Sequence, residues 1–435
     1  MSIHLPENIE LILNKLKEYG SIGYVVGGCV RDYFLGKSPD GWDICTGLLP
    51  EVVESVFQDY QVIETGIKHG TVTVIINDEP YEITTFRIDG AYSDGRHPDN
   101  VNFTDRLEED LKRRDFTINA MAYNPDVGIV DLFNGLQDIQ DGVIRCVGNP
   151  DDRFKEDGLR ILRALRFAIT LGFRIENQTL YAMTQNRGLL DSISKERICT
   201  EMCKMMSTQF PNAFKVLYNC LELFYCITPY FDDGVKRAYT LFEHHEVIES
   251  LIATNKDDEL VVRMALLLSF ADNPKEILTN MRMDNQSIKS IVDILRHKED
   301  YKHTSIEPDE RKYEVRKLIN EIGFRNTKNL CDYWTAKATV ASPINKFKYL
   351  KLTRQMKIDA GIIVGNNECC TLKQLDITGD DLIEIGYEPS EELGEILHLL
   401  LDEVMREPYK NKKKWLITWA QEYLKDNQEI IQDSN

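Results

Sequence analysis

The sequence has 435 residues, of which 43% are hydrophobic and 28% charged, and its formal net charge is −19 at pH 7. This length exceeds what one small core needs, so we expect several domains. No run of about 18 apolar residues predicts a membrane span, and the N-terminal segment lacks the basic-then-apolar pattern of a signal peptide. The acidic balance argues against a generally nucleic-acid-binding surface, although a local basic patch would suffice.

The ten cysteines are scattered along the chain. They include no two matched pairs with the spacing of a zinc knuckle. Cysteines distributed in this way are typical of proteins kept in a reducing compartment. We therefore expect a cytoplasmic protein.

The first 120 residues alternate between helical and strand patterns. Apolar spacing predicts a helix over residues 6–19, and a Gly-Gly turn separates a short strand from the next helix. The further expected elements are strand Tyr24–Val26, helix Val30–Leu35, strand Trp42–Thr46, helix Glu51–Phe57, and strands Thr71–Ile76 and Tyr81–Arg87. Together they predict one sheet with helices.

Beyond about Asp151 the pattern changes, because helical periodicity dominates and strand signals almost vanish. The expected helices span residues 152–171, 196–207, 212–222, 235–253, 259–269, 286–297 and 308–322. The sequence therefore predicts an all-helical region behind a mixed α/β head.

Two glycines, Gly27 and Gly28, follow the first strand and precede the helix that carries Arg31. Glycines allow backbone N–H groups to approach an anion, and an arginine in the first helical turn can hold a phosphate. A tight strand-to-helix turn with a surface arginine is the alternative interpretation.

Acidic residues lie on and near the next strand. Asp43 falls on it, Asp40 lies three residues earlier, and Glu82 lies on a later strand. Paired divalent ions held by carboxylates are the core of nucleotidyl transfer. Because strand side chains alternate, Asp40 is not in simple alternation with Asp43. Turn acids beside a strand, with an exposed Glu82, are the alternative.

Four segments together resemble the class II nucleotidyltransferases, the family of the tRNA CCA-adding enzymes and the bacterial poly(A) polymerases. They are GGCVRDYFLG, SPDGWDICT, RRDFTINAMAY and EDGLRILRALRFA, in the family's order within residues 24–168. The resemblance implies an α+β fold, with a polymerase-β-like head followed by an all-helical neck, body and tail. The expected domains are a catalytic head over residues 1–140, a base-reading neck over 141–210, a degenerate HD-like body over 211–330 and a tRNA-binding tail over 331–435.

The activity that this resemblance implies is addition of CCA to the 3′ end of tRNA from CTP and ATP, without a template. Two Mg²⁺ ions would assist in-line attack of the tRNA 3′-hydroxyl on an α-phosphate, and pyrophosphate would leave. An A-adding enzyme or a poly(A) polymerase of the same family is the first alternative. The sequence predicts no membrane partner and does not indicate an oligomeric state.

One position departs from the family pattern, which places two aspartates at alternate positions shortly after a proline. Gly41 stands where the first metal ligand belongs, while Asp43 matches the second. Asp40 is the candidate replacement ligand, although a shift of one strand residue normally turns a side chain to the other face. A catalytically impaired RNA-binding relative is therefore the second alternative.

Asp157 and Arg160 lie three residues apart in a predicted helix, and so on one face. An acceptor beside donors matches the amino group and ring acceptor that both cytosine and adenine present. Uracil and guanine would leave buried polar groups unpaired, at roughly 1–3 kcal/mol each. The resemblance implies the same base-reading role, and an i,i+3 salt bridge on a surface helix is the alternative.

Five more residues are candidates for contacts with the nucleotide. Arg163 and Arg166 continue the same helix, where they would either touch the nucleotide or pack the neck. The resemblance implies contacts with the sugar and phosphates for Arg114, Asp115 and Asn119. A charged turn before a helix is the alternative for these three.

Four further segments carry predictions. Residues 87–103 resemble the family's flexible loop, which addition of the terminal A requires, and the acidic helix start over 105–115 is expected to face solvent. Candidate contacts to tRNA phosphates are Lys346, Lys348, Lys412, Lys413 and Lys414, which lie close to aromatic residues. A solubilising helix face is the alternative for both basic runs.

Overall fold

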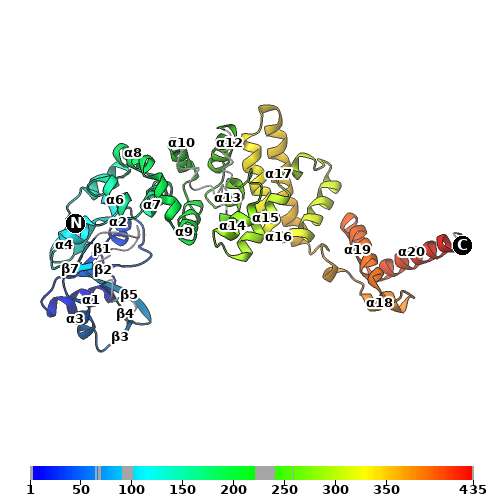
Figure 1. Cartoon of the computed structure of the whole chain (residues 1–435). Helices are drawn as coiled ribbons and strands as arrows, with labels where there is room; N and C mark the ends of the chain where they lie inside the picture. The colour runs from blue at the N-terminus through cyan, green and yellow to red at the C-terminus, as the bar shows by residue number, and fades with distance from the viewer. Residues whose placement is uncertain are drawn as a thin grey trace. The chain divides into compact units, whose positions relative to one another are not determined.

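The structure is a computed structural model that describes residues 3–63, 66, 70–90, 101–220, 241–257 and 259–433. The chain forms two compact units, Met1–Ala238 and Tyr239–Asn435 (Figure 1). Within the described ranges, no helix is long and apolar enough to cross a membrane. The nine cysteines found there form no disulfide.

The first unit begins with a mixed sheet whose described strands run in the order β3-β4-β5-β2-β1-β8-β9. These strands are β1 (Tyr24–Val26), β2 (Ile44–Thr46), β3 (Gln61–Ile63), β4 (Thr71–Ile76), β5 (Glu79–Thr85), β8 (Met121–Asn124) and β9 (Gly128–Asp131). β2 and β5 are parallel, with Ile44 opposite Ile83, and the other neighbours are antiparallel. A separate pair joins β6 (Arg87–Asp89) to β7 (Val101–Phe103).

Helices accompany this sheet, as the sequence predicted. They are α1 (Glu7–Glu18), α2 (Gly28–Phe34), α3 (Pro50–Val56), α4 (Leu107–Lys112), the 3-10 turn η2 (Thr117–Asn119) and α5 (Gly135–Asp141). α1 buries Ile9, Ile12, Leu13 and Leu16, which form one helical face. Mixed sheet and helices confirm the predicted α+β head.

Two element boundaries differ from expectation near the candidate site. β2 begins at Ile44, so Asp43 precedes the strand, although its carbonyl still accepts the Val26 N–H at 3.0 Å. α2 begins at Gly28 and not at Val30. Both shifts leave the predicted side chains at the carboxyl end of β1 and the start of β2.

The remaining elements of the first unit are mostly helical. They are β10 (Val143–Ile144), α6 (Pro150–Glu156), α7 (Leu159–Leu171), β11 (Arg174–Ile175), α8 (Asn177–Gln185), η3 (Arg187–Ser192), α9 (Lys195–Met206), η4 (Pro211–Lys215) and α10 (Val216–Asn219). The helix predicted over 196–207 corresponds to α9, which packs against α7. The helix predicted over 212–222 is instead a 3-10 turn followed by a short helix, and its last two residues lie outside the described ranges.

The single helix predicted over residues 152–171 is wrong, because α6 and α7 meet at a bend. Asp157 has extended backbone angles (φ −147°, ψ 106°), and its carboxylate accepts the Leu159 N–H at 3.0 Å. A Cβ atom on Gly158 would lie only 2.9 Å from the Cβ of Leu189. The bend therefore depends on glycine and on the aspartate that follows α6.

The second unit is helical throughout its described residues. Its elements are α12 (Leu241–Ile252), α13 (Leu260–Leu267), α14 (Pro274–Asn280), α15 (Asn285–Arg296), η5 (Asp300–Lys302), α16 (Pro308–Val340), α17 (Pro343–Gly365), η6 (Leu372–Gln374), α18 (Gly379–Glu384), α19 (Glu391–Arg406), η7 (Pro408–Lys410) and α20 (Lys413–Asp433). Of the helix predicted over 235–253, residues 235–240 lie outside the described ranges. The helix predicted to end at residue 322 continues as α16 past a break at Gly323, where φ is 80°.

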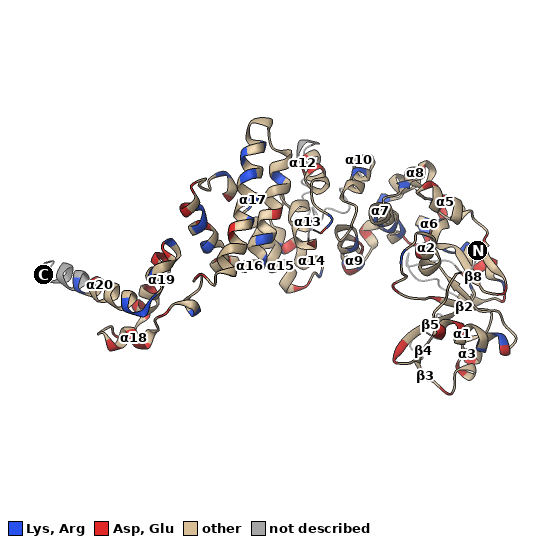
Figure 2. Cartoon of the chain, turned by 180° about the vertical axis from the view of Figure 1, so that it is seen from behind, with Lys and Arg blue, Asp and Glu red and all other residues tan. Residues whose placement is uncertain are grey.

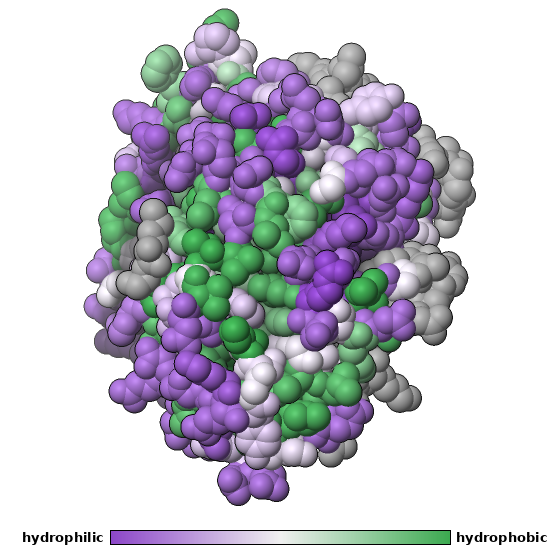
Figure 3. All heavy atoms as spheres, turned by 90° about the vertical axis from the view of Figure 1, so that its left-hand side faces the viewer, coloured by the Kyte–Doolittle hydropathy of each residue, from purple (hydrophilic) through white to green (hydrophobic). Residues whose placement is uncertain are grey.

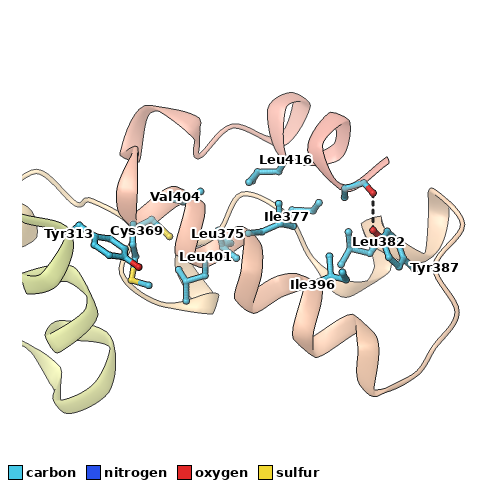
Figure 4. Close-up of a cluster of buried hydrophobic side chains, with 13 residues drawn as sticks. Tyr313, Cys369, Leu375, Ile377, Leu382, Tyr387, Ile396, Leu401, Val404 and Leu416 are labelled. Atoms are coloured by element: carbon cyan, nitrogen blue, oxygen red, sulfur yellow. Dashed lines mark hydrogen bonds between the residues drawn. The ribbon is translucent and has the colours of Figure 1, made fainter. Parts of the chain in front are cut away.

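The last helices share an apolar core (Figure 4). Leu382 of α18, Leu401 of α19 and Leu416 of α20 are each 1% exposed or less. The Tyr387 hydroxyl donates to the carbonyl of Ala420 at 2.8 Å. These contacts hold the short C-terminal helices together.

Hydrophilic residues cover most of the face drawn in Figure 3, and hydrophobic residues gather near its middle. Exposed large apolar side chains of the first unit include Ile22, Leu49 and Leu132. Such exposure is common on globular proteins. The candidate site is identified instead by its cluster of charged side chains.

Candidate active site

A cavity of about 380 Å³ lies in the first unit, where the turn after β1, the segment before η2 and helix α7 meet. Its lining residues are Gly27, Gly28, Arg31, Asp43, Arg113, Arg114, Asp115, Asn119, Asp157, Arg160, Arg163 and Phe167. The cavity brings together every residue predicted for catalysis or nucleotide binding except Asp40, Glu82 and Arg166. Figure 2 shows the basic residues on α7. A guanidinium-rich cavity of this size suits a small anionic ligand.

The two glycines after β1 bring the backbone close to two guanidinium groups. Gly27 has φ 82°, and a Cβ there would lie 3.1 Å from Nη1 of Arg114. A Cβ on Gly28 would lie 3.7 Å from Nη2 of Arg31. A side chain at Gly27 would be strained and would crowd Arg114, so this turn favours glycine.

Arg31 is fixed at the cavity by two partners. Its Nη1 donates to Oδ1 of Asn119 at 2.7 Å, while Nε and Nη2 donate to Oδ1 of Asp32 at 2.9 and 2.8 Å. Each terminal nitrogen has a second N–H. Arg31 is therefore held in place and keeps donors for a ligand.

Asp115 joins the head segment to α7. Its Oδ1 accepts from Nδ2 of Asn119 at 3.1 Å, and its Oδ2 accepts from Nε of Arg163 at 2.8 Å. Burial raises the pKa of Asp115, but Arg163 and the Asn119 hydrogen bond outweigh burial and lower it to about 2. The carboxylate is therefore ionised at neutral pH and anchors Arg163.

Phe167 is a lining residue that the sequence analysis missed. The guanidinium carbons of Arg31, Arg163 and Arg166 lie 5.1, 5.4 and 3.9 Å from its ring centroid. Arg166 does not line the cavity, and its Nε donates to Glu201 of α9 at 2.5 Å. Arginines that recur every third residue next to an aromatic were a usable signal for this packing.

Asp110 contradicts the expectation that the acidic helix start faces solvent. It is 0% exposed, and its carboxylate pairs with Arg113 at 2.7 Å and with Arg114 at 3.2 Å. Burial raises its pKa, but these two guanidinium groups lower it below the ordinary value. The Nε of Arg114 is buried without a hydrogen-bond partner among the described residues. Asp110 therefore holds Arg114 beside the cavity with an unused donor.

Asp157 and Arg160 both line the cavity, but their side chains pair with other residues. Arg160 donates to Glu156 at 2.6 Å, whereas Asp157 pairs with Arg197 of α9 at 2.7 Å. The backbone N–H of Arg160 does donate to the carbonyl of Asp157 at 3.0 Å. Because the two side chains pair with other residues, the alternative of an i,i+3 salt bridge between them is wrong. Arg197 was not predicted, since 40 residues separate it from Asp157.

The three candidate metal-binding carboxylates differ in their position relative to the cavity. Asp43 lines it, and the parallel register of β2 and β5, extended by one residue, places Glu82 beside Asp43 on the same face. Asp40 is exposed and does not line the cavity. A Cβ on Gly41 would meet nothing within 4 Å. Within the described ranges, no three His, Cys, Asp or Glu residues are grouped to hold a metal ion.

The predicted loop over residues 87–103 is described only at its ends, because residues 91–100 lie outside the described ranges. Its ends form β6 and β7. Asp89 of β6 lies 3.5 Å from Arg113, which lines the cavity. The base of the loop is therefore linked to the cavity wall.

The predicted RNA-binding lysines lie in the second unit and differ in their surroundings. Lys412, Lys414 and Lys348 are exposed, and Lys346 is half-buried. Lys413 pairs with Asp381 of α18 at 2.7 Å, and this contact raises its pKa. Lys413 is also exposed, but its ion pair links the start of α20 to α18.

Three family profiles match the chain in succession. They are the Poly A polymerase head domain over residues 23–145, the "Probable RNA and SrmB- binding site of polymerase A" over 172–233 and the tRNA nucleotidyltransferase domain 2 over 253–420. With the head sheet and the arginine-lined cavity, these matches define the class as a nucleotidyltransferase.

Curated relatives and solved structures narrow this class. The CCA-adding enzyme of Ligilactobacillus salivarius is 33% identical over 95% of this chain and 96% of its own length. That of Lactococcus lactis is 34% identical over 94% and 96%. The crystal structure of the Bacillus stearothermophilus CCA-adding enzyme in complex with CTP has a TM-score of 0.75 and 27% identity, covering 98% of this chain and 100% of that one. The Thermotoga maritima enzyme complexed with tRNA, at 20% identity and a TM-score of 0.68, shares the fold over 97% of this chain and 96% of its own.

The chain belongs to the family of the CCA-adding enzymes. This confirms the predicted family, the predicted fold class and the prediction of an enzyme, and it favours CCA addition over the poly(A) polymerase alternative. The predicted domain boundaries and the roles of individual residues remain predictions.

Proposed function

We propose that this protein adds CCA to the 3′ end of tRNA, using CTP and ATP as substrates and no nucleic-acid template. The observation that carries the proposal is one cavity that combines a wall of anchored arginines with an aspartate and an arginine at the start of α7. A nucleotide has both a polyanionic end and a base edge, so both parts of the cavity have a partner. The expected location is the cytoplasm.

The arginines would bind the triphosphate. Arg31 keeps unused N–H groups, and Arg114 has a buried Nε without a partner among the described residues. Phosphate oxygens supply the acceptors that these donors lack. Asp115 and Asn119 would act by holding Arg163 and Arg31 in position.

Asp157 and Arg160 would read the base. The carboxylate of Asp157 would accept the exocyclic amino group of cytosine or adenine, and Arg160 would donate to the neighbouring ring nitrogen. Uracil and guanine present a carbonyl and an N–H instead, and so would leave both partners unsatisfied. The tRNA 3′-hydroxyl would attack the α-phosphate of the bound nucleotide, and pyrophosphate would leave.

Mg²⁺ is the expected cofactor, and the residues present match it only in part. Asp43 and Glu82 offer the oxygen ligands that Mg²⁺ prefers, but Gly41 offers none. Mg²⁺ would supply charge neutralisation at the phosphates. Because the donor set is one carboxylate short, we propose that the chain folds and binds nucleotides and tRNA but turns over slowly.

The test uses the full chain and tRNA that ends at the discriminator base, incubated with each of the four nucleotides and with pairs of them. Incorporation of both CTP and ATP supports the proposal. Incorporation of ATP alone identifies an A-adding enzyme or poly(A) polymerase. Binding of tRNA without incorporation, by this chain and also by its Gly41→Asp variant, identifies an RNA-binding relative without activity.

A further inference from the structure

Asp157, which we propose to read the base, forms an ion pair with Arg197 of α9. The proposed function gives no role to Arg197. Arg197 of α9 donates from Nη2 to Oδ2 of Asp157 at 2.7 Å and from Nη1 to Oδ1 at 3.3 Å. The two side chains are 22% and 15% exposed. Arg197 is not among the residues that line the cavity. It therefore contacts the aspartate and is not placed to contact a bound nucleotide.

The hydrogen bonds of Asp157 leave one of its oxygens less engaged than the other. Oδ1 accepts from Arg197 and also from the Leu159 N–H at 3.0 Å, so both of its lone pairs are used. Among the described residues, Oδ2 accepts from Arg197 alone. One lone pair of Oδ2 is therefore available to a further donor.

We propose that Arg197 is a positioning residue for base selection, which holds Asp157 so that Oδ2 accepts the exocyclic amino group of CTP or ATP. This inference rests on the proposed function. The Leu159 N–H alone fixes one oxygen and leaves the carboxylate free to turn about its terminal torsion, which is soft. Two parallel N–H donors from a planar guanidinium fix both oxygens at once.

The pair also ties α9 to the α6–α7 bend, so a purely structural role must be distinguished. A structural role predicts a lower melting temperature with unchanged preference among nucleotides. A positioning role predicts that the preference itself changes, because the arginine wall continues to bind every triphosphate. The ratio of the dissociation constants for UTP and CTP is therefore the decisive quantity.

The experiment compares the full chain with its Arg197→Ala and Arg197→Lys variants, by titration calorimetry with CTP, ATP and UTP. We expect Arg197→Ala to reduce the UTP-to-CTP ratio about ten- to a hundredfold, mainly through weaker CTP and ATP binding. Arg197→Lys keeps the cation without the fork and should lie between. It also keeps the test decisive if the alanine variant does not fold. Lys204→Ala is the matched control, because Lys204 is an exposed cation on the same helix.

The possible outcomes distinguish failure of the role of Arg197 from failure of the proposed function. A ratio that stays constant in both Arg197 variants, whatever their melting temperatures, overturns the inference alone. If the unmodified chain shows no preference for CTP and ATP over UTP, the proposed function fails and the inference fails with it. A reduced ratio in Arg197→Ala, together with an unchanged ratio in Lys204→Ala, supports both.

Discussion

The cavity wall and the tail hold their positive charges in different ways. Arg31, Arg114 and Arg163 each have a carboxylate partner, at 2.8, 3.2 and 2.7 Å. In the described part of the tail, Lys412 and Lys414 are exposed and have no ion pair. Anchored guanidinium groups suit one small ligand of defined shape, whereas exposed lysines suit a long polyanion that many geometries can satisfy.

Gly41→Asp tests whether the anchored arginine wall is sufficient for turnover. We expect the rate of nucleotide addition to rise about a hundredfold or more, because metal ligation contributes several kcal/mol of transition-state stabilisation. A Cβ at this position meets nothing within 4 Å, so the substitution should not disturb the fold. Single-turnover addition of CMP to tRNA measures the rate, and nucleotide affinity without metal should stay nearly constant. A fast unmodified chain that Asp40→Ala inactivates would show that Asp40 is the missing ligand.

Asp157→Ala tests whether the part of the cavity that is proposed to contact the base, and not the arginine wall, selects the nucleotide. The variant should lose about tenfold or more in kcat/KM for both CTP and ATP, since each lost base contact costs roughly 1–3 kcal/mol. Use of UTP should change little, so discrimination against it relaxes. Steady-state kinetics with all four nucleotides provide the measurement. If the variant and the unmodified chain have identical kinetics, Asp157 does not select the base and its role is limited to the ion pair with Arg197.

Asp115→Asn tests whether the anchoring carboxylates stabilise the wall. The pKa of Asp115 is lowered from 3.8 to about 2, so its ionised form stabilises the fold above about pH 4. This contribution, about 2 kcal/mol, is lost as the pH falls toward about 2. The difference in melting temperature between the chain and its Asp115→Asn variant should therefore be large at pH 7 and small near pH 2. A difference that does not vary with pH would assign the effect to packing.

Substitution of the tail lysines tests whether exposed cations bind a long polyanion, and its expected effect is smaller than those above. Replacing Lys412 and Lys414 by Ala should weaken tRNA binding and reduce its salt dependence by up to about two phosphate contacts. Lys413→Ala is the matched control, because the Lys413 side chain already pairs with Asp381. That control should leave the salt dependence of tRNA binding unchanged, and the melting temperature should change little because the pair is exposed. Equal salt slopes for all three proteins would assign the exposed lysines to solubility.

Local patterns determined much of this protein from its sequence. Strands Tyr24–Val26 and Thr71–Ile76 have their predicted bounds. The conformation of a short apolar run bounded by glycine or polar residues is set by its neighbours in the chain, so the sequence alone indicates it. The motif residues Gly27 and Asp43 line the cavity as expected, because each lies next to the end or the start of a strand.

Only the tertiary structure decided which charges meet. Asp110 lies in an acidic segment that predicts solvent exposure, yet it is buried between Arg113 and Arg114. Asp157 faces Arg197 and not Arg160, because the α6–α7 bend and the packing of α9 on α7 join residues far apart in sequence. Helical periodicity indicates which face of a helix is buried, but it contains no information about the residue that a second helix places opposite.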